Sequence, residues 1–171
     1  MSNIIGEEIN TGALSEIIIR PIEAKATMSL RHSVLWPEMD LSYVVLPEDD
    51  SGIHLGAFLP GRDEPIAVIS VFIDTAASEQ SSAITDQQTA FSEPAVCFRK
   101  FACHPDYQGQ GIGTALLKHA FLVAGSELGA KVIWCDARLA KSDWYRKRGM
   151  VSFGDRFFKG SVEYIRMKMS L

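Results

Sequence analysis

The chain has 171 residues, 47% of them hydrophobic and 22% charged, with a formal net charge of −4, as expected for one globular domain with a core of useful size. No apolar run approaches the roughly 18 residues of a membrane span, and the first residues lack the basic start and apolar stretch of a secretory signal. We therefore expect a cytoplasmic protein without a membrane partner, consisting of a flexible leader over residues 1–15 and one domain over residues 16–171.

The charge is distributed unevenly along the chain. Up to Phe98 there are 4 Lys/Arg against 15 Asp/Glu, and from Arg99 onward there are 13 against 6. This asymmetry indicates either two binding surfaces of opposite sign or two halves that neutralise each other across the fold. Because the whole chain is acidic, we expect no nucleic-acid partner.

Three cysteines, Cys97, Cys103 and Cys135, lie in apolar, strand-like runs. Their odd number and the absence of a C-x-x-C pair argue against a disulfide framework and a zinc site, so we expect no metal. Two interpretations stay open, namely buried reduced thiols and a catalytic thiol.

The first half predicts a strand, a helix and a hairpin, in that order. The strand is Glu16–Arg20, stopped by Pro21, and the helix covers residues 22–36, ending before Pro37. An acidic irregular stretch with a short element at Tyr43–Leu46 follows. Residues 53–59 and 65–74 then form two strands joined by the turn signal PGRDE, and a polar insertion lies near residues 76–93.

The second half alternates strands and helices before a final pair of strands. We expect a strand at Ala95–Cys103, a helix from Gly111 to Glu127 ended by Gly129, a buried strand at 131–137, a short helix at 141–149 and strands at 151–158 and 162–169. The order β-α-β-β-β-α-β-α-β-β predicts an α+β (mixed α/β) fold with antiparallel ends.

A glycine-rich turn, with Gly109, Gly111 and Gly113, separates the strand at 95–103 from the long helix. The free N–H groups and the dipole of a helix N-terminus bind anions, and glycine lets a phosphate approach the backbone. The alternative is a tight turn that needs positive φ, for which one glycine would suffice. A P-loop is excluded because no Lys follows Gly113. A dinucleotide fingerprint lacks its third glycine, since Thr114 stands there, although Asp136 keeps that alternative open.

The spacing Gln108-x-x-Gly111-x-Gly113 resembles the Q/R-x-x-G-x-G/A motif of the GNAT acetyltransferase superfamily. The stretch Trp144-Tyr145-x-x-x-Gly149 resembles the second signature of that family, with Met150 where Phe is usual. The resemblance implies a GNAT-like central twisted mixed sheet of about seven strands flanked by helices. It also implies acetyl-CoA as cosubstrate, transfer of its acetyl group to the primary amine of a small molecule or peptide, and a monomer or homodimer.

The same resemblance implies site residues. Strands 95–103 and 131–137 would splay apart, and the pantetheine arm of the coenzyme would pair with the backbone of the first, whose amide N–H could polarise the thioester carbonyl. Tyr145 would be the general acid. The implied cofactor-binding residues are Phe101, Ala102, Cys103, Gln108, Gly109, Gln110, Gly111, Ile112, Gly113, Thr114 and Lys141. A non-catalytic acyl-CoA-binding module of the same fold stays as the alternative.

Two positions depart from the family pattern. Arg138 stands where many members have Asn, and Lys141 where a small residue is common. Both add positive charge, which suits the phosphates of the coenzyme.

The general base and the acceptor are less defined. Candidates for the base are Glu38, His54, Asp136 and His104, although His104 before a proline is typical of a turn residue. An acidic cluster on the side where the family often binds its acceptor would attract a cationic amine, unless it is only a solvated loop; its members are Glu38, Asp40, Glu48, Asp49 and Asp50.

Overall fold

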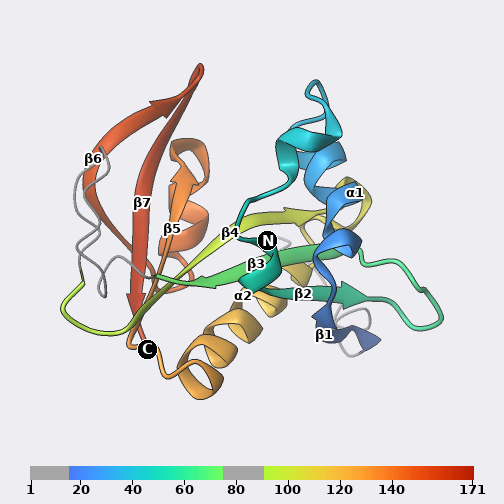
Figure 1. The fold of residues 1–171 in the computed structure, drawn as a ribbon, viewed down its shortest axis with the longest axis horizontal. Helices are drawn as coiled ribbons and strands as arrows, with labels where there is room; N and C mark the ends of the chain where they lie inside the picture. Colours follow the sequence, from blue (N-terminus) through green and yellow to red (C-terminus); the bar gives the residue numbers. More distant parts are fainter. Residues whose placement is uncertain (1–15, 75–90) are drawn as a thin grey trace, which may run out of the picture.

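The computed structural model describes residues 16–74 and 91–171. The expected leader, and residues 76–90 of the expected insertion near 76–93, lie outside the described residues. Seven strands form one sheet in the order β1-β2-β3-β4-β5-β7-β6, in which β4 and β5 form the only parallel pair among the described residues. This mixed sheet with helices on both faces confirms the expected fold class (Figure 1).

The first half builds one edge of the sheet and a helical cover. Its elements are β1 (Ile18–Ile22), η2 (Ala24–Thr27), α1 (Met28–Leu30), η3 (Arg31–Leu35), η4 (Leu41–Val44), η5 (Asp49–Ser51), β2 (Ile53–Phe58) and β3 (Ala67–Ile73), where η marks a 3₁₀ or π turn. The expected stop at Pro21 is wrong, because Pro21 lies inside β1 opposite Leu55. An edge strand accepts proline, since one of its sides has no strand to bond.

The second half follows the expected order closely. Its elements are β4 (Ala95–Cys103), η7 (Pro105–Tyr107), α2 (Ile112–Leu122), η8 (Val123–Glu127), β5 (Val132–Arg138), η9 (Leu139–Lys141), α3 (Ser142–Arg146), β6 (Val151–Lys159) and β7 (Val162–Ser170). Gly129 ends the long helix with φ +64°, as expected. None of the helices in the described ranges is long and apolar enough to cross a membrane.

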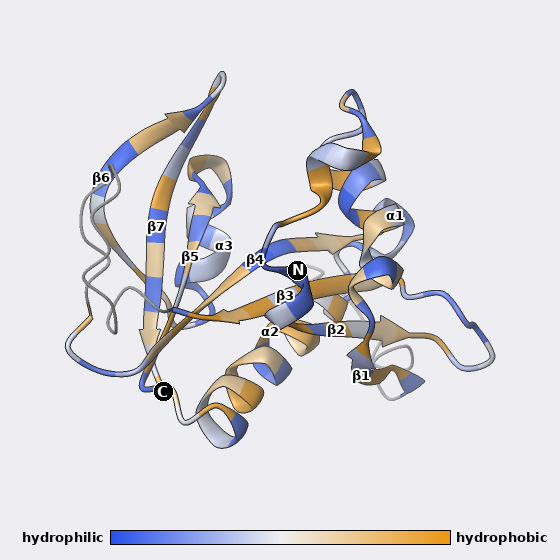
Figure 2. Cartoon of the chain, viewed as in Figure 1, coloured by the Kyte–Doolittle hydropathy of each residue, from blue (hydrophilic) through white to orange (hydrophobic). Residues whose placement is uncertain are grey.

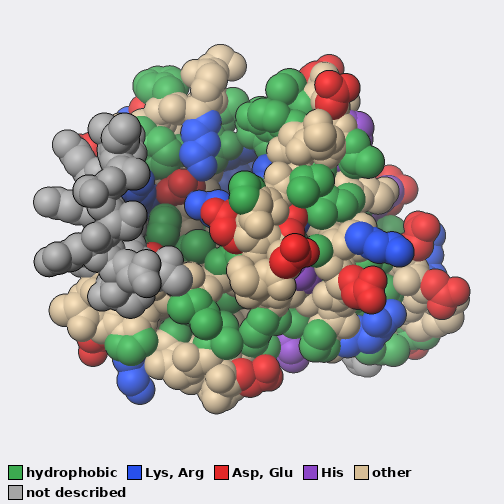
Figure 3. Space-filling view, in the orientation of Figure 1, with side chains coloured by type: hydrophobic (Ala, Val, Ile, Leu, Met, Phe, Trp, Pro, Cys, Tyr) green, Lys and Arg blue, Asp and Glu red, His purple; other side chains and the backbone are tan. Residues whose placement is uncertain are grey.

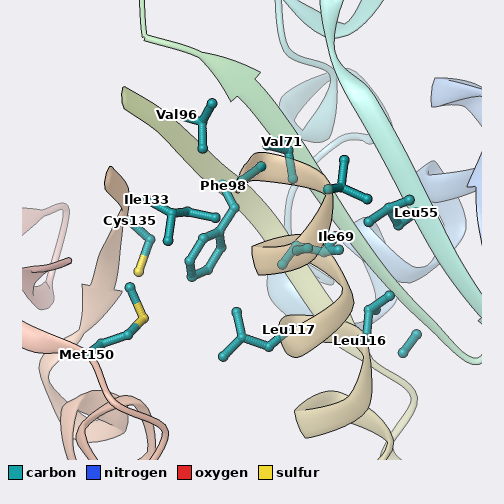
Figure 4. Close-up of a cluster of buried hydrophobic side chains, with 14 of the residues drawn as sticks. Leu55, Ile69, Val71, Val96, Phe98, Leu116, Leu117, Ile133, Cys135 and Met150 are labelled. Carbon is teal, nitrogen blue, oxygen red and sulfur yellow. The ribbon is translucent and has the colours of Figure 1, made fainter. Parts of the chain in front are cut away.

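The main core lies between the sheet and α2. Leu116 and Leu117 of α2 are fully buried against Ile69, Phe98 and their neighbours, and hydrophobic residues concentrate along β2, β3 and β4 (Figures 2 and 4). Burying one such leucine contributes about 1.5–3 kcal/mol. Met150 is buried in the same core, so its difference from the family's Phe is a change of core packing.

Residues 24–51 cover the opposite face of the sheet, which we call the η face, as distinct from the α2 face. Leu30 packs there on Val68 and Ala102. Along β5 the alternation of side chains sends Ile133, Cys135 and Ala137 to the α2 face and Val132 and Trp134 to the η face. The same alternation places Asp136 and Arg138 on the η face.

Candidate functional site

The parallel strands β4 and β5 separate after a short common stretch. They pair only at Ala95↔Val132, Val96↔Ile133 and Cys97↔Trp134, and then diverge (Figure 1). Beyond these residues, no described strand pairs with the facing edges of β4 and β5. The expected splay is confirmed, and the gap, which we call the fork, exposes an edge that can accept an extended ligand as an added strand.

A β-bulge lies on the β4 arm of the fork. The register with β3 runs from Ser70↔Arg99 to Val68↔Ala102, so Lys100 and Phe101 together face one residue of β3. Lys100 has φ +52°, the only positive φ of a non-glycine residue in the described ranges. A left-handed conformation costs an L-residue about 1–2 kcal/mol, and such strain concentrates at functional sites.

A cavity of about 880 Å³ passes through the fork. Its lining combines residues of the α2 face, such as Phe98 and Tyr145, with residues of the η face, such as Trp134 and Lys100. Figure 3 shows the hollow between strands β5 to β7 and residues 24–51, with Lys and Arg side chains along its sides. All three tryptophans of the chain, Trp36, Trp134 and Trp144, line this cavity.

The glycine turn closes one end of the cavity, and two of its glycines serve the backbone. Gly109 has φ +74°, and Gly111, which caps α2, has φ +82°. The alternative explanation by turn geometry thus accounts for both of them. Gly113 has no positive φ but lines the cavity in the first turn of α2. A Cβ there would lie 3.5 Å from the Phe101 ring, so a larger side chain would narrow the cavity.

Ten of the twelve expected site residues line the cavity: Phe101, Ala102, Cys103, Gln108, Gly109, Gly111, Gly113, Thr114, Lys141 and Tyr145. The other two are not in its lining. Gln110 donates from Nε2 to the Asp106 carbonyl at 3.0 Å, and Ile112 is buried in the core. Gln108 donates from Nε2 to the Cys103 carbonyl at 2.9 Å, which ties the glycine turn to the end of β4.

Tyr145 of α3 lies below the fork on the α2 face. Its ring is 6.0 Å from that of Phe98 and 5.1 Å from that of Trp144. Its hydroxyl has no hydrogen-bond partner among the described residues. Burial, with a smaller contribution from Cys135, raises the pKa of Tyr145 far above its usual value. The phenol therefore keeps its proton at neutral pH and is free to donate it into the cavity.

The cysteines do not have the properties of a catalytic thiol. Burial raises the pKa of Cys97 to about 11 and also raises the pKa of Cys103 and of Cys135. Because the thiolate is the nucleophile, protonated thiols of this kind are unreactive. Within residues 16–74 and 91–171, no group of three His, Cys, Asp or Glu side chains could hold a metal ion.

Of the four candidates for the general base, only Asp136 lines the cavity. Lys159 Nζ lies 2.9 Å from its carboxylate and Arg166 Nε lies 3.3 Å from it. His104 accepts a hydrogen bond from the Asp106 N–H, at the start of η7, as a turn residue does. His54 is buried elsewhere, and Glu38 is exposed outside the lining.

The expected acidic entrance does not form, because none of its five residues lines the cavity. Asp49 is buried, and both oxygens of its carboxylate accept from Arg31 at 2.8 Å. The carboxylate atom Oε1 of Glu48 lies 3.8 Å from Nη1 of Arg99. Asp49 is therefore used inside the protein, and the other four residues are exposed to solvent, as the alternative of a solvated loop expects.

Cationic side chains line the cavity instead, and the two sequence motifs did not indicate most of them. Arg99, Lys100, Arg138, Lys141, Arg148 and Lys159 all take part, against Asp136 as the single carboxylate in the lining. All six lie after Phe98, so the charge asymmetry was the signal that could have found them. Arg148 donates from Nε to Thr114 Oγ1 at 2.8 Å, near the glycine turn.

Arg138 does not extend towards the glycine turn, where the phosphates of the coenzyme were expected. Its guanidinium donates from Nη2 to the Leu35 carbonyl at 3.1 Å and lies 5.4 Å from the Trp36 ring. The side chain therefore crosses from β5 to η3 on the η face, away from the glycine turn at the N-terminus of α2.

Comparisons with known proteins agree with this geometry. A sequence model described as an acetyltransferase (GNAT) domain matches residues 62–150. The uncharacterized N-acetyltransferase YitI of Bacillus subtilis is 28% identical over 141 residues, which cover 81% of this chain and 85% of that protein.

Solved structures show the same fold. Escherichia coli ElaA superposes with a TM-score of 0.66 at 15% identity, over 89% of this chain and 98% of that one. An acyl-CoA N-acyltransferase from Pseudomonas aeruginosa superposes with a TM-score of 0.63 at 17% identity, over 89% and 98% of the two chains.

Proposed function

The chain belongs to the GNAT acetyltransferase family, and we propose that it transfers the acetyl group of acetyl-CoA directly to a primary amine of a small molecule or peptide, with Tyr145 as general acid. Membership of the family makes the chain an acyltransferase. The observation that carries the finer proposal is the position of Tyr145, whose protonated and unpartnered hydroxyl lies at the fork.

The cavity suits a long phosphorylated cosubstrate. The free edge of β4 over Phe101–Cys103 would bond the amides of a pantetheine arm, as a strand would. The N-terminus of α2, with Gly111 and Gly113, would receive the pyrophosphate. Arg148 lies on this side and adds positive charge for the phosphates, and Lys141, which also lines the cavity, would add to it. Because Gly113 has no side chain, the cavity beside it would leave room for the phosphates.

The reaction forms a C–N bond and breaks a C–S bond. The neutral amine attacks the thioester carbon, and the negative charge that develops on the carbonyl oxygen is stabilised by a backbone N–H of the bulge near Phe101. As the C–S bond breaks, Tyr145 gives its proton to the leaving sulfur; the amine nitrogen loses a proton to water, and water returns a proton to the Tyr145 phenolate. Burial raises the pKa of Tyr145, so the phenol is protonated before the reaction, and the proton moves to sulfur only as negative charge develops there during C–S cleavage.

The two alternatives have less support. A non-catalytic acyl-CoA-binding module would have no use for an unpartnered phenol at the fork. A dinucleotide site would use Asp136 to bind ribose hydroxyls, but that carboxylate is already held by Lys159 and Arg166.

Replacing Tyr145 by Phe tests the proposal. We expect kcat to fall about 10²- to 10⁴-fold, because a general acid contributes that much, while acetyl-CoA affinity changes little. Thiol release with a panel of amines gives the rate, and thermal stability gives binding, since a ligand at about 100 times its Kd stabilises the protein by about 2.7 kcal/mol.

The matched control is Tyr107→Phe, whose hydroxyl accepts from Arg62 outside the cavity lining. Equal turnover by the Tyr145→Phe protein and the unmodified chain would remove Tyr145 from the mechanism. Stabilisation by NAD but not by acetyl-CoA would favour the dinucleotide alternative.

A further inference from the structure

Two cations from the opposite arms of the fork lie beside one aromatic pair. The rings of Trp36 and Tyr43 meet edge to face, with their centroids 5.2 Å apart. The guanidinium of Arg138, at the end of β5, is 5.4 Å from the Trp36 ring. The ammonium of Lys100, in the bulge of β4, is 5.7 Å from the Tyr43 ring. Together these four side chains form a wall of the cavity on the η face, which we call the cationic wall.

Neither cation of this wall has a carboxylate partner within salt-bridge distance among the described residues. The other two cavity-lining cations on this face have carboxylate neighbours, because Arg99 lies near Glu48 and Lys159 pairs with Asp136. Lys100 and Arg138 therefore leave an excess of positive charge at the fork.

The surroundings of Lys100 make its charge costly in the free protein. Burial lowers its pKa, and the charges of Arg31, Lys159 and Arg99 lower it further, whereas Asp49 opposes them. The residue is also in the strained left-handed conformation. An anion bound at this point would relieve the repulsion, and charged hydrogen bonds to it would be strong in a half-buried site.

The coenzyme does not account for this excess charge. The glycine turn and Arg148, which donates to Thr114 beside it, supply the phosphate side, and Tyr145 lies on the α2 face. The cationic wall lies on the η face, beyond the fork, where the acceptor would approach the thioester.

Resting on the proposed acetyl transfer, we propose that the acceptor is an amine that also carries a carboxylate, as a free amino acid does, and that Lys100 and Arg138 bind this carboxylate. Trp36, Tyr43 and Leu46 supply an apolar surface for the body of the acceptor. The carboxylate takes no part in bond making, since the amine nitrogen forms the amide and the thiol leaves. A polycationic amine would meet the same excess of positive charge as repulsion.

Matched pairs of acceptors test the proposal. L-phenylalanine, L-leucine and L-methionine are each offered with acetyl-CoA as the free acid and as the carboxamide, and spermidine is offered as a cationic amine. For the unmodified chain we expect kcat/KM for at least one free acid to exceed that for its amide by about tenfold or more, since charged hydrogen bonds contribute that much, and to exceed that for spermidine.

Charge removal at the wall should erase this preference. We expect Lys100→Met and Arg138→Met each to lower the acid-to-amide ratio of kcat/KM about tenfold or more, mainly through KM for the acid. Lys118→Met removes an exposed lysine of α2 outside the cavity lining and should leave the ratio as it is.

The outcomes separate this inference from the proposed function. Turnover of the amides or spermidine at least as fast as the free acids would overturn the carboxylate site and leave acetyl transfer intact. If no amine is acetylated, the proposed function fails, and calorimetric titration of the protein with CoA bound decides the site. Binding of an acid that is tighter than that of its amide, and weakened by Lys100→Met, would support it, and equal binding or none would overturn it.

Discussion

Two groups of charged side chains on the η face differ in their burial and in their partners. In the first, the fully buried Arg31 donates to both oxygens of Asp49 and also to Ser70 Oγ and the Val44 carbonyl. In the second, Lys100 and Arg138 line an open cavity and have no carboxylate partner among the described residues. The comparison teaches that a paired buried charge holds structure, whereas an unpaired charge in a cavity is available to a ligand.

The two groups are connected through the chain. His54 donates from Nε2 to the Asp49 carbonyl, and its Nδ1 lies 2.7 Å from Ser70 Oγ, so the buried cluster ties η5 to β2 and β3. The bond from Arg31 to Val44 also fixes the turn that holds Tyr43. The buried cluster therefore positions one side of the cationic wall. Substitutions in the buried cluster and in the cationic wall both test the comparison.

The largest effect is expected from Arg31→Met, which leaves the buried carboxylate of Asp49 without its cation. Breaking such a pair costs about 3–5 kcal/mol of stability, measured by urea unfolding. The double change Arg31→Met with Asp49→Leu should recover part of the loss, because an apolar pair can replace a buried ion pair. A loss below about 1 kcal/mol, no larger than for the exposed Arg62→Met, would show that the cluster does not hold residues 31–51.

A smaller effect is expected from Asp49→Asn, and it depends on pH. Burial raises the pKa of Asp49, but the hydrogen bonds from Arg31 and the Leu46 N–H and the charges of Arg31 and His54 outweigh burial, so the pKa is below its usual value. The ionised carboxylate then stabilises the fold fully above the unfolded pKa of about 4 and stops doing so as pH falls through the folded pKa.

We therefore expect Asp49→Asn to cost about 2 kcal/mol at pH 7 and much less as the pH falls below about 4. Urea unfolding of both proteins at several pH values measures this difference. A cost that stays constant down to pH 3 would mean that the charge of Asp49 does not contribute.

The smallest effect has the opposite sign and comes from the cationic wall. Lys100→Gly removes a desolvated charge and a left-handed strain of about 1–2 kcal/mol, offset in part by the entropy of glycine. We expect a net gain of about 1 kcal/mol in thermal unfolding at neutral pH. Since the pKa of Lys100 is lowered, the part of this gain due to charge decreases as pH rises through that pKa. Lys100→Met keeps the strained φ, so its gain in stability should be smaller. A Lys100→Gly protein that is less stable than the unmodified chain would contradict the comparison.

The sequence predicted the order of elements and most of the glycine turn because local signals specify them. Glycines at 109 and 111 and the apolar spacing of α2 depend on residues close in the chain. The burial of Asp49 was not predicted by either interpretation of the acidic cluster, since its partner is Arg31 from another turn and no local pattern shows this pairing. The wall formed by Trp36, Tyr43, Lys100 and Arg138 was missed for the same reason, because it unites residues 36–43 with two distant strands.

The placement of the three tryptophans gives the chain an optical reporter of its own. Trp144 lies beside Phe101 near the glycine turn, Trp36 lies under Arg138, and Trp134 donates to Asp74 on the η face. Every indole therefore senses a different stretch of one cavity, with no indole elsewhere in the chain to add background. Emission from single Trp→Phe variants can record, without a label, which stretch of the cavity each ligand reaches and in what order.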